Sequence, residues 1–294
     1  MSKNIGNWPV IKPDDRRLFI SGPERTSSSW ARVSAFFVDL KFLPKADAGL
    51  DTQILHGHSV RVLEQKGEWT KIASQLTGKN GETKDHYVGW VLSSGISSDT
   101  PAPTHRVIAP RTFLYPEADM KKPRSGYRSM GSLITVVGHL ETRGTAYGIL
   151  SNGNAVIDRH ISPLTETSGD YVAVAEQLLA TPYLWGGNTG FGIDCSGLVQ
   201  LSMEMAGKAV FRDTDMQAAT IGAPVDIKGD WSDLQRGDLI FWRGHVAIAQ
   251  GYKSGEAHLI HANGYTMDVT SEPVQQAVDR IAYLYEMPIG VRRP

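Results

Sequence analysis

Runs of alternating apolar and polar residues fill the first half of the chain. Residues 59–64, 69–73 and 87–91 alternate in this way, with turn residues between the runs. Because successive side chains of a strand point to opposite faces, these runs predict the short strands of a small all-β domain. Residues 1–30 are polar and rich in Pro and Ser, so we expect an arm followed by a loop there.

Two stretches of this region recur further along the chain. Leu43-Pro-Lys-Ala-Asp resembles Tyr115-Pro-Glu-Ala-Asp, and His56-Gly-His-Ser-Val-Arg-Val-Leu resembles Met130-Gly-Ser-Leu-Ile-Thr-Val-Val. The offset between the copies is nearly constant, which predicts a duplicated domain. The order of strands, turns and a closing Gly-Trp-Val strand resembles the bacterial SH3-like domain, more closely in the first copy than in the second.

The apolar pattern becomes helical after residue 165. Residues 172–179 have helical spacing behind Asp170, which we expect to cap a helix. A second run, from Leu198 to Ala206, is apolar on nearly every face and ends before Gly207, as a buried helix would. Strand candidates follow at residues 238–242, 245–250 and 258–262. Helices followed by antiparallel strands predict an α+β domain.

Cys195 is the only cysteine, and it stands where the second helix is expected to begin. Four glycines and an asparagine crowd the ten residues before it, which suits a tight loop. Unpaired N–H groups and the helix dipole at such a junction favour a thiolate, the nucleophilic form of cysteine. The alternative is a small buried hydrophobic residue.

The composition is that of an ordinary globular protein. A length of 294 residues suggests two or three domains. A net charge of −1 provides no long-range field for nucleic acid or anionic lipid, so neither partner is implied. The N-terminus lacks an apolar leader, and one cysteine cannot form an internal disulfide, so the expected location is the cytoplasm, unless a leader has been removed from the chain.

A nucleophilic cysteine needs a base beside it and a third group that orients the base. His245 opens one strand candidate and His261 lies in the next, with turn residues between them. Adjacent antiparallel strands would bring both histidines to one edge of a sheet.

Five linked motifs make the C-terminal part similar to the NlpC family of papain-like bacterial cell-wall cysteine peptidases. They are Tyr183-x-Trp-Gly-Gly, Asp194-Cys-Ser-Gly-Leu-Val, Arg236-Gly-Asp-Leu-Ile-Phe-Trp, Gly244-His-Val-Ala-Ile and Ile260-His-Ala. With two SH3-like domains upstream, the whole chain resembles the γ-D-glutamyl-L-diamino acid endopeptidases that recycle murein peptides. The resemblance implies domains at residues 1–100, 101–166 and 167–294, the last being papain-like.

This resemblance also implies roles for individual residues. Cys195 would be the nucleophile, His245 the general base and acid, and His261 the group that orients His245. A neutral histidine in the third position would orient more than it stabilises charge. The Cys195 backbone N–H and the Tyr183 hydroxyl would hold the oxyanion. No metal or other cofactor is expected.

Further residues are implied in binding small murein peptides of the type L-Ala-γ-D-Glu-diamino acid. Asp194 and Ser196 would contact the substrate, and Asp194 is suited to the free ammonium of L-Ala. Tyr87 would line the amine pocket from the first SH3-like domain. The sequence has His58 where these enzymes tend to carry an acid, and Glu82 or Asp85 could compensate.

Other functions are compatible with parts of the sequence. A zinc site made of Cys195, His245 and His261 lacks the close ligand pairs typical of zinc sites. A hydrolase or amidase acting on intact peptidoglycan would use the same fold. A non-catalytic wall-binding protein would be expected to have lost one of these three residues.

Overall fold

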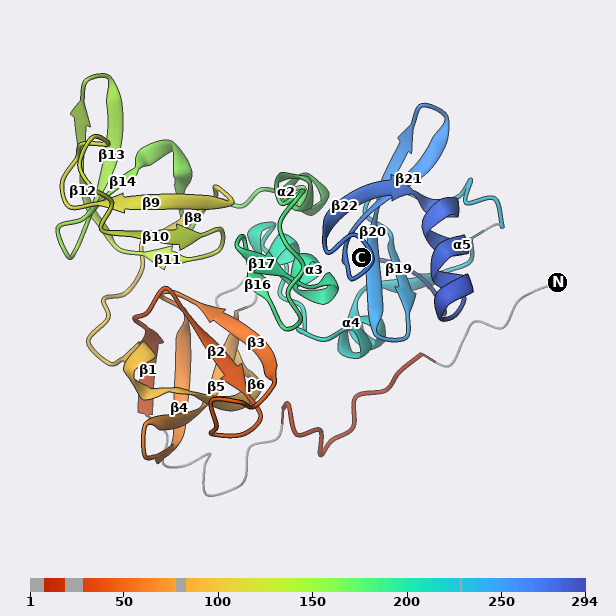
Figure 1. Cartoon of the computed structure of the whole chain (residues 1–294), viewed down its shortest axis with the longest axis horizontal. Coiled ribbons are helices and arrows are strands. Elements are labelled where there is room, and N and C mark those ends of the chain that lie inside the picture. The colour runs from red at the N-terminus through yellow and green to blue at the C-terminus, as the bar shows by residue number, and fades with distance from the viewer. Residues whose placement is uncertain (1–7, 19–28, 78–82, 228) are drawn as a thin grey trace. The chain divides into compact units, whose positions relative to one another are not determined.

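The computed structural model describes residues 8–18, 29–77, 83–227 and 229–294. These residues form two compact units, a β unit and an α+β unit (Figure 1). The β unit holds residues 14–167 and 186–191. The α+β unit holds the described residues up to Pro13, together with residues 168–185 and 192–294.

The described strands of the first β domain form one sheet in the order β3-β2-β6-β5-β4-β1-β7. The elements are β1 (Ser29–Val33), β2 (Phe37–Lys41), β3 (Leu50–Leu55), β4 (Ser59–Lys66), β5 (Trp69–Thr77), β6 (Thr83–Leu92), η1 (Ser93–Gly95) and β7 (Ile96–Ser97). Strands β4, β5 and β6 contain the three alternating runs, so the sequence prediction is confirmed there. Inward side chains of β1, β2, β4 and β5, including Val33, Leu40, Val60 and Ile72, form the core of this domain.

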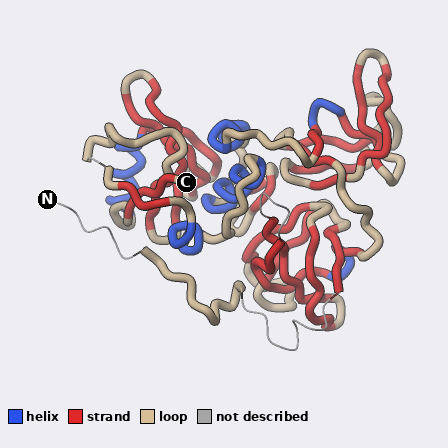
Figure 2. Tube along the Cα trace, turned by 180° about the vertical axis from the view of Figure 1, so that it is seen from behind, coloured by secondary structure: helices blue, strands red, loops and turns tan. Residues whose placement is uncertain are grey.

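The second β domain repeats this plan with shorter strands. Its elements are β8 (His105–Val107), β9 (Arg111–Tyr115), β10 (Gly126–Ser129), β11 (Leu133–Ile134), β12 (Val136–Thr142), β13 (Thr145–Leu150), β14 (Ala155–Ile157), η2 (Asp158–His160) and β15 (Ile161–Pro163). The short strand β16 (Asn188–Thr189) also belongs to the β unit. Figure 2 shows that strands and single 3-10 turns make up the regular structure of both domains.

The duplication is visible in equivalent hydrogen bonds of the two domains. The Gly57 N–H donates to the Val33 carbonyl at 2.8 Å, and the Gly131 N–H donates to the Val107 carbonyl at 2.9 Å. Both glycines have positive φ, 80° and 84°, a conformation that glycine adopts without strain. The Gly that recurs in the sequence therefore serves the same turn twice.

The two β domains are in direct contact within their unit. The Leu133 N–H donates to the His56 carbonyl at 2.8 Å, and His58 Nε2 bonds the Gly131 carbonyl at 3.0 Å. A Cβ atom on Gly57 would lie 2.1 Å from the Leu133 oxygen. Because His58 bonds the second β domain in this way, its ring is part of the junction between the two domains.

The α+β unit packs helices against an antiparallel sheet in the order β18-β23-β19-β20-β21-β22. Its elements are α2 (Tyr171–Gln177), β17 (Gly192–Ile193), α3 (Cys195–Met205), α4 (Thr214–Thr220), β18 (Ala223–Val225), β19 (Leu239–Trp242), β20 (His245–Lys253), β21 (Glu256–Asn263), β22 (Asp268–Pro273), α5 (Val274–Leu284) and β23 (Gly290–Arg293). Helix α3 contacts β20 and β21, and α5 contacts β21 and β22 (Figure 1). The α+β prediction is confirmed.

Helix α2 begins where the sequence predicts. Asp170 Oδ1 accepts hydrogen bonds from the N–H groups of Val172 (2.9 Å) and Ala173 (3.2 Å), as an N-cap does. The Arg236 guanidinium bonds the Asp170 carboxylate at 3.0 Å and the Glu176 carboxylate at 3.1 Å. The arginine of the Arg236-Gly-Asp motif thus holds α2 in place.

Two short segments group differently from the predicted domain ranges. Residues 8–13 of the N-terminal arm belong to the α+β unit, where the Trp8 ring packs edge-on against Phe241 with centroids 6.1 Å apart. Residues 186–191, in the loop before Cys195, belong to the β unit, where the Gly190 N–H donates to Ser129 Oγ at 2.8 Å. The order of the segments along the chain does not predict that these two segments belong to the other unit.

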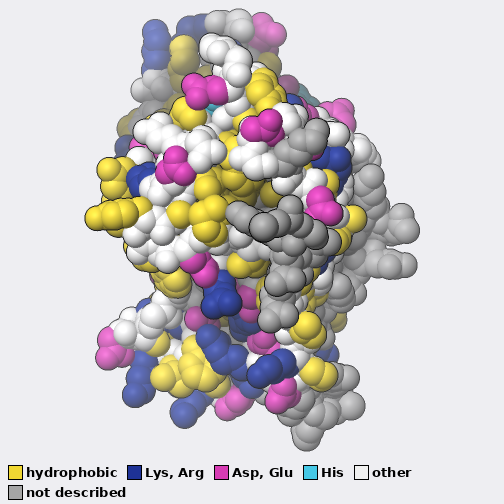
Figure 3. Space-filling model, turned by 90° about the vertical axis from the view of Figure 1, so that its right-hand side faces the viewer, with side chains coloured by type: hydrophobic (Ala, Val, Ile, Leu, Met, Phe, Trp, Pro, Cys, Tyr) yellow, Lys and Arg dark blue, Asp and Glu magenta, His cyan; other side chains and the backbone are white. Residues whose placement is uncertain are grey.

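The surface shows no region of a single charge on the face drawn in Figure 3, where acidic, basic and hydrophobic side chains are interspersed. Within the described ranges, every helix is too short or too polar to cross a membrane.

Candidate active site

Cys195 is the first residue of α3, as the sequence predicts. Asp194 caps the helix, since its Oδ1 accepts the Gly197 N–H at 2.7 Å. The Cys195 Sγ lies 3.9 Å from Thr214 Oγ1 and 3.9 Å from the Gly244 carbonyl oxygen. The thiol therefore lies at a helix N-terminus, beside the turn that leads into β20.

The charge state of this thiol differs from the sequence prediction. Burial and the neighbouring Asp194 carboxylate raise the pKa of Cys195 to about 11, although hydrogen bonds from Val246 and Thr214 oppose the rise. The side chain is only 6% exposed, so desolvation outweighs the helix N-terminus. The prediction of a free thiolate is wrong for this site, and the thiol needs a base to ionise.

The two histidines lie together, as predicted. His245 begins β20, His261 lies in the adjacent strand β21, and His245 Nε2 is 2.9 Å from His261 Nδ1. Within the described residues, the Cys195 thiol makes no hydrogen bond to the His245 ring, although it contacts the residue just before it. Such bonds often form only when substrate binds.

A carboxylate that the sequence did not reveal stands behind the histidine pair. His261 Nε2 is 2.7 Å from Glu272 Oε1, and Arg280 of α5 bonds the same oxygen. An ionised carboxylate only accepts, so His261 carries its proton on Nε2 and accepts from His245 on Nδ1. His245 then carries its proton on Nε2, and its Nδ1 is left as the basic nitrogen.

Electrostatics keep this histidine chain neutral at rest. Burial, His261 and Arg280 lower the pKa of His245 well below its usual range. Burial also lowers the pKa of His261. Burial alone would raise the pKa of the Glu272 carboxyl, but its bonds to His261 and Arg280 outweigh that effect and lower it.

Because both His261 nitrogens are engaged in hydrogen bonds, His261 has no lone pair for the zinc ion of the alternative hypothesis.

Asp194 and Ser196, implied as substrate contacts, are already bonded within the protein. Arg212 donates to both Asp194 oxygens, at 2.9 and 2.8 Å, and to Ser196 Oγ at 2.8 Å. The Arg212 side chain is 1% exposed and that of Asp194 is 11% exposed. Asp194 is therefore not a free carboxylate awaiting an ammonium, and its first role is a buried ion pair that fixes the start of α3.

Tyr183 lies close to the nucleophile. Its strand bridge to Ile193 places it beside the two residues that precede Cys195. Burial and the charges of Cys195 and Asp194 raise the Tyr183 pKa, so its hydroxyl stays protonated and can donate a hydrogen bond.

A cavity of about 730 Å³ opens beside Tyr183 and His245. Its wall includes exposed aromatic residues, among them Trp185, Tyr265 and Tyr285. A cavity of this size accommodates a small peptide.

Tyr87 lies in the core of the first β domain and is 3% exposed. Its backbone is left-handed, with φ of 49°, a strained conformation for a non-glycine residue. Its role in an amine pocket stays a prediction. Of the acids that could replace His58, Glu82 lies outside the described residues, and only the backbone of Asp85 is described, in β6.

Glu272 gives the first testable prediction. In Glu272→Gln the amide oxygen can still accept from His261, but the negative charge is lost. A charge that acts on the His245 ring from the far side of His261 contributes about 2 kcal/mol at an effective dielectric constant of about 20. We expect kcat to fall about 30-fold and the acidic limb of kcat/KM to move to lower pH.

The matched control is Glu256→Gln, an exposed glutamate at the start of β21, the strand that pairs with the Glu272 strand β22. It should leave both kcat and the pH profile unchanged. A loss of activity in Glu272→Gln without a shift of the acidic limb would mean that Glu272 acts only on the local fold.

A cysteine at a helix N-terminus beside a histidine pair on an antiparallel sheet is the arrangement of papain-like cysteine peptidases. The C-terminal domain belongs to the NlpC/P60 family of these enzymes, since residues 180–284 match that family. Residues 43–96 match the bacterial dipeptidyl-peptidase SH3 domain. The fold prediction and the family resemblance are confirmed.

Relatives of known name extend over most of the chain. The γ-D-glutamyl-L-lysine dipeptidyl-peptidase of Bacillus subtilis is 27% identical over 74% of this chain and 70% of its own length. The enzyme of the same name from Bacillus cereus is 27% identical over 79% and 73%. A crystal structure of an NlpC/P60 family protein from Bacillus cereus shares the fold, with a TM-score of 0.69 and 22% identity, over 90% of this chain and 99% of that one.

Proposed function

We propose that the protein hydrolyses the bond between D-glutamate and the diamino acid in murein peptides of the type L-Ala-γ-D-Glu-diamino acid. The observation that carries the proposal is the similarity, across both kinds of domain, to two γ-D-glutamyl-L-lysine dipeptidyl-peptidases. The diamino acid is lysine or meso-diaminopimelate. Peptides with a free N-terminal L-Ala arise during murein recycling, which would place the enzyme in the cytoplasm.

The proposed reaction uses the histidine chain as base and acid. His245 Nδ1 takes the proton of Cys195, and the thiolate attacks the γ-carbonyl carbon of D-glutamate. The backbone N–H of Cys195 and the Tyr183 hydroxyl would stabilise the oxyanion. His245 then gives its proton to the leaving amine of the diamino acid.

The acyl-enzyme formed in this way is a thioester of L-Ala-γ-D-Glu. Water attacks it with His245 again acting as base, which releases the dipeptide and restores the thiol. His261 holds the His245 ring, and Glu272 supplies the negative charge that a neutral histidine lacks. This charge favours the imidazolium that forms in each transition state.

Selection for a free L-Ala amine is the part of the proposal that the structure changes. An unpaired Asp194 cannot be its source, because Arg212 already neutralises that carboxylate. The selection would then rest on contacts other than a new ion pair to Asp194, and we expect N-acetylation to reduce kcat/KM by about tenfold rather than to abolish cleavage.

Mass spectrometry of digests tests both the bond and the amine. The substrate L-Ala-γ-D-Glu-L-Lys-D-Ala should give L-Ala-γ-D-Glu and L-Lys-D-Ala, with the acetylated peptide cleaved more slowly at the same bond. Release of the acetyl group from the acetylated peptide, by cleavage of the amide at the L-Ala nitrogen, would identify an amidase. Equal rates for free and acetylated peptides would favour intact peptidoglycan as the substrate.

A further inference from the structure

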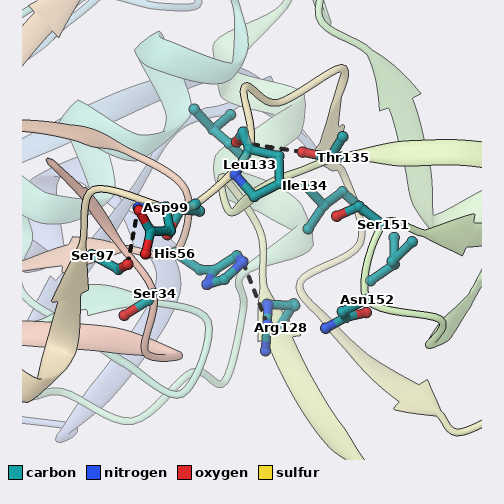
Figure 4. Close-up of a pocket in the computed structure, with 13 residues that line it drawn as sticks. Ser34, His56, Ser97, Asp99, Arg128, Leu133, Ile134, Thr135, Ser151 and Asn152 are labelled. Atoms are coloured by element: carbon teal, nitrogen blue, oxygen red, sulfur yellow. Dashed lines mark hydrogen bonds between the residues drawn. The ribbon is translucent and has the colours of Figure 1, made fainter.

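A small cavity with both polar and apolar walls lies at the junction of the two β domains, inside the β unit (Figure 4). Its volume is about 210 Å³. The first domain and the linker after it contribute Ser34, His56, Ser97, Asp99, Thr100 and Pro101; the second contributes Arg128, Leu133, Ile134, Thr135, Leu150, Ser151 and Asn152. None of the residues assigned to catalysis lines this cavity.

Arg128 supplies a positive charge with no acid beside it. Its guanidinium donates to the Tyr127 carbonyl at 2.8 Å and to His56 Nε2 at 3.4 Å, both uncharged acceptors. The buried Nε has no acceptor, and no carboxylate of the described residues lies within ion-pair distance. Burial alone lowers the pKa of Arg128 to about 10. A half-buried arginine without a counter-charge is costly unless a ligand provides one.

His56 adds no charge of its own. Its Nδ1 lies 2.9 Å from the Ala35 carbonyl oxygen, which can only accept, so the proton is on Nδ1. The lone pair on Nε2 then faces Arg128, as Figure 4 shows by the dashed line between the two side chains. Burial and Arg128 lower the pKa of His56 to about 4, so the ring is neutral at pH 7. The half-buried Arg128 guanidinium is thus the positive charge of the cavity wall.

We propose that this cavity is a binding site for a small ligand with an α-carboxylate, either a free amino acid or the C-terminal residue of a short peptide. Guanidinium groups match carboxylates through parallel N–H donors. The side chains of Ser151 and Asn152, from the loop after β13, lie across the cavity from His56 and can donate to the same ligand (Figure 4). The volume suits one small residue rather than a folded partner or a glycan.

The charge balance favours a carboxylate over a phosphate. One cation neutralises a monoanion, whereas a phosphate dianion would be left with excess charge. The exposed carboxylate of Asp99, also in the wall, would repel a dianion but can accept from the ammonium of an amino acid. The inference is independent of the proposed peptidase reaction, because it concerns other residues and a binding event without chemistry.

The test is an NMR titration of the full-length protein with four probes: alanine, alanylalanine, alaninamide and inorganic phosphate. Alanine should shift signals of the cavity residues and saturate, and alaninamide, which lacks the carboxylate, should not. Binding of alanylalanine as well would identify a peptide end, and its failure would identify a free amino acid. Arg128→Met should weaken the binding of alanine at least about tenfold, which is the effect of losing a hydrogen bond to a charged group.

Two further variants keep the test decisive. Ser151→Leu fills part of the cavity and leaves Arg128 in place, and it should also weaken the binding of alanine. This variant keeps the proposal testable if Arg128→Met does not fold. Arg124→Met removes an exposed arginine that stacks on Phe113 and should change nothing. Equal binding of alaninamide, tighter binding of phosphate, unchanged affinity in Arg128→Met and Ser151→Leu, or no binding of any probe would overturn the proposal.

Discussion

Replacement of Cys195 by alanine removes the nucleophile, and we expect kcat/KM for the murein tetrapeptide to fall by about 10⁴-fold or more. The fold should survive, because the contacts of the thiol with Thr214, Gly244 and Val246 are weak hydrogen bonds to sulfur, the first two 3.9 Å long. His245→Ala should be nearly as damaging, since nucleophile and base act as a unit. His261→Ala should cost less, because it leaves the basic nitrogen of His245 in place.

The control for this series is Ser202→Ala in the same helix. Ser202 is fully buried and its hydroxyl has no partner among the described residues, so the change resembles Cys195→Ala in size and place. It should retain wild-type kcat/KM and a similar thermal midpoint. Measurable turnover in Cys195→Ala, at more than a few per cent of the Ser202→Ala rate, would rule out cysteine catalysis.

Replacement of Arg212 by methionine should have the largest effect on stability. It removes the guanidinium that bonds both oxygens of the buried Asp194 carboxylate, while the bonds from the Gly197 N–H and the Ser196 hydroxyl, both uncharged, remain. Breaking one side of a buried ion pair in this way costs about 3–5 kcal/mol in the free energy of unfolding. Denaturant unfolding of the full-length protein measures it, on the transition of the α+β unit.

Two controls separate the ion pair from general damage. Arg243→Met removes an arginine whose side chain is 81% exposed and should cost less than about 0.5 kcal/mol. The double variant Asp194→Asn with Arg212→Met removes the uncompensated charge and should be more stable than Arg212→Met alone. If Arg212→Met were no worse than Arg243→Met, the ion pair would have no part in holding α3.

The sequence predicts those elements in which a short stretch of residues shows a clear apolar periodicity. The alternating runs of the first β domain, the capped helix after Asp170 and the apolar helix after Cys195 all formed as expected. In each case one periodicity decides between helix and strand. The turn glycines Gly57 and Gly131 were found because the same turn is built twice.

Helix α5 was missed although its sequence carries a signal. Its buried residues Val274, Ala277, Val278 and Ile281 have the spacing of a helix with one apolar face. Helix α4 carries a weaker signal, because part of its burial is polar. Gln217 in that helix is fully buried and donates to the Ser196 and Phe211 carbonyls.

The residues that complete the site could not be predicted from local sequence. Arg212 lies 18 positions from Asp194, and Glu272 lies 11 positions from His261, in separate elements. Only the fold brings these charges together. The predicted thiolate form of Cys195 is wrong for the same reason. The sequence indicates the helix N-terminus, which favours the thiolate, but not the burial that raises the pKa of the thiol.

Local sequence patterns also do not predict the cavity between the two β domains. His56 and Arg128 come from different copies of the repeat, and the sequence gives no sign that they face each other. Figure 4 shows why: the two side chains meet only where the domains join. The contact between the two β domains thus creates a cavity that neither domain contains alone.

Detection of the acyl-enzyme is the most direct test of the central claim, that Cys195 attacks the γ-carbonyl of D-glutamate. The full-length protein is mixed with L-Ala-γ-D-Glu-L-Lys-D-Ala, quenched with acid within milliseconds and measured by intact-protein and peptide mass spectrometry. The account predicts a transient mass increase equal to L-Ala-γ-D-Glu less one water, located on Cys195. An adduct on another residue, or one that contains the diamino acid, would contradict it.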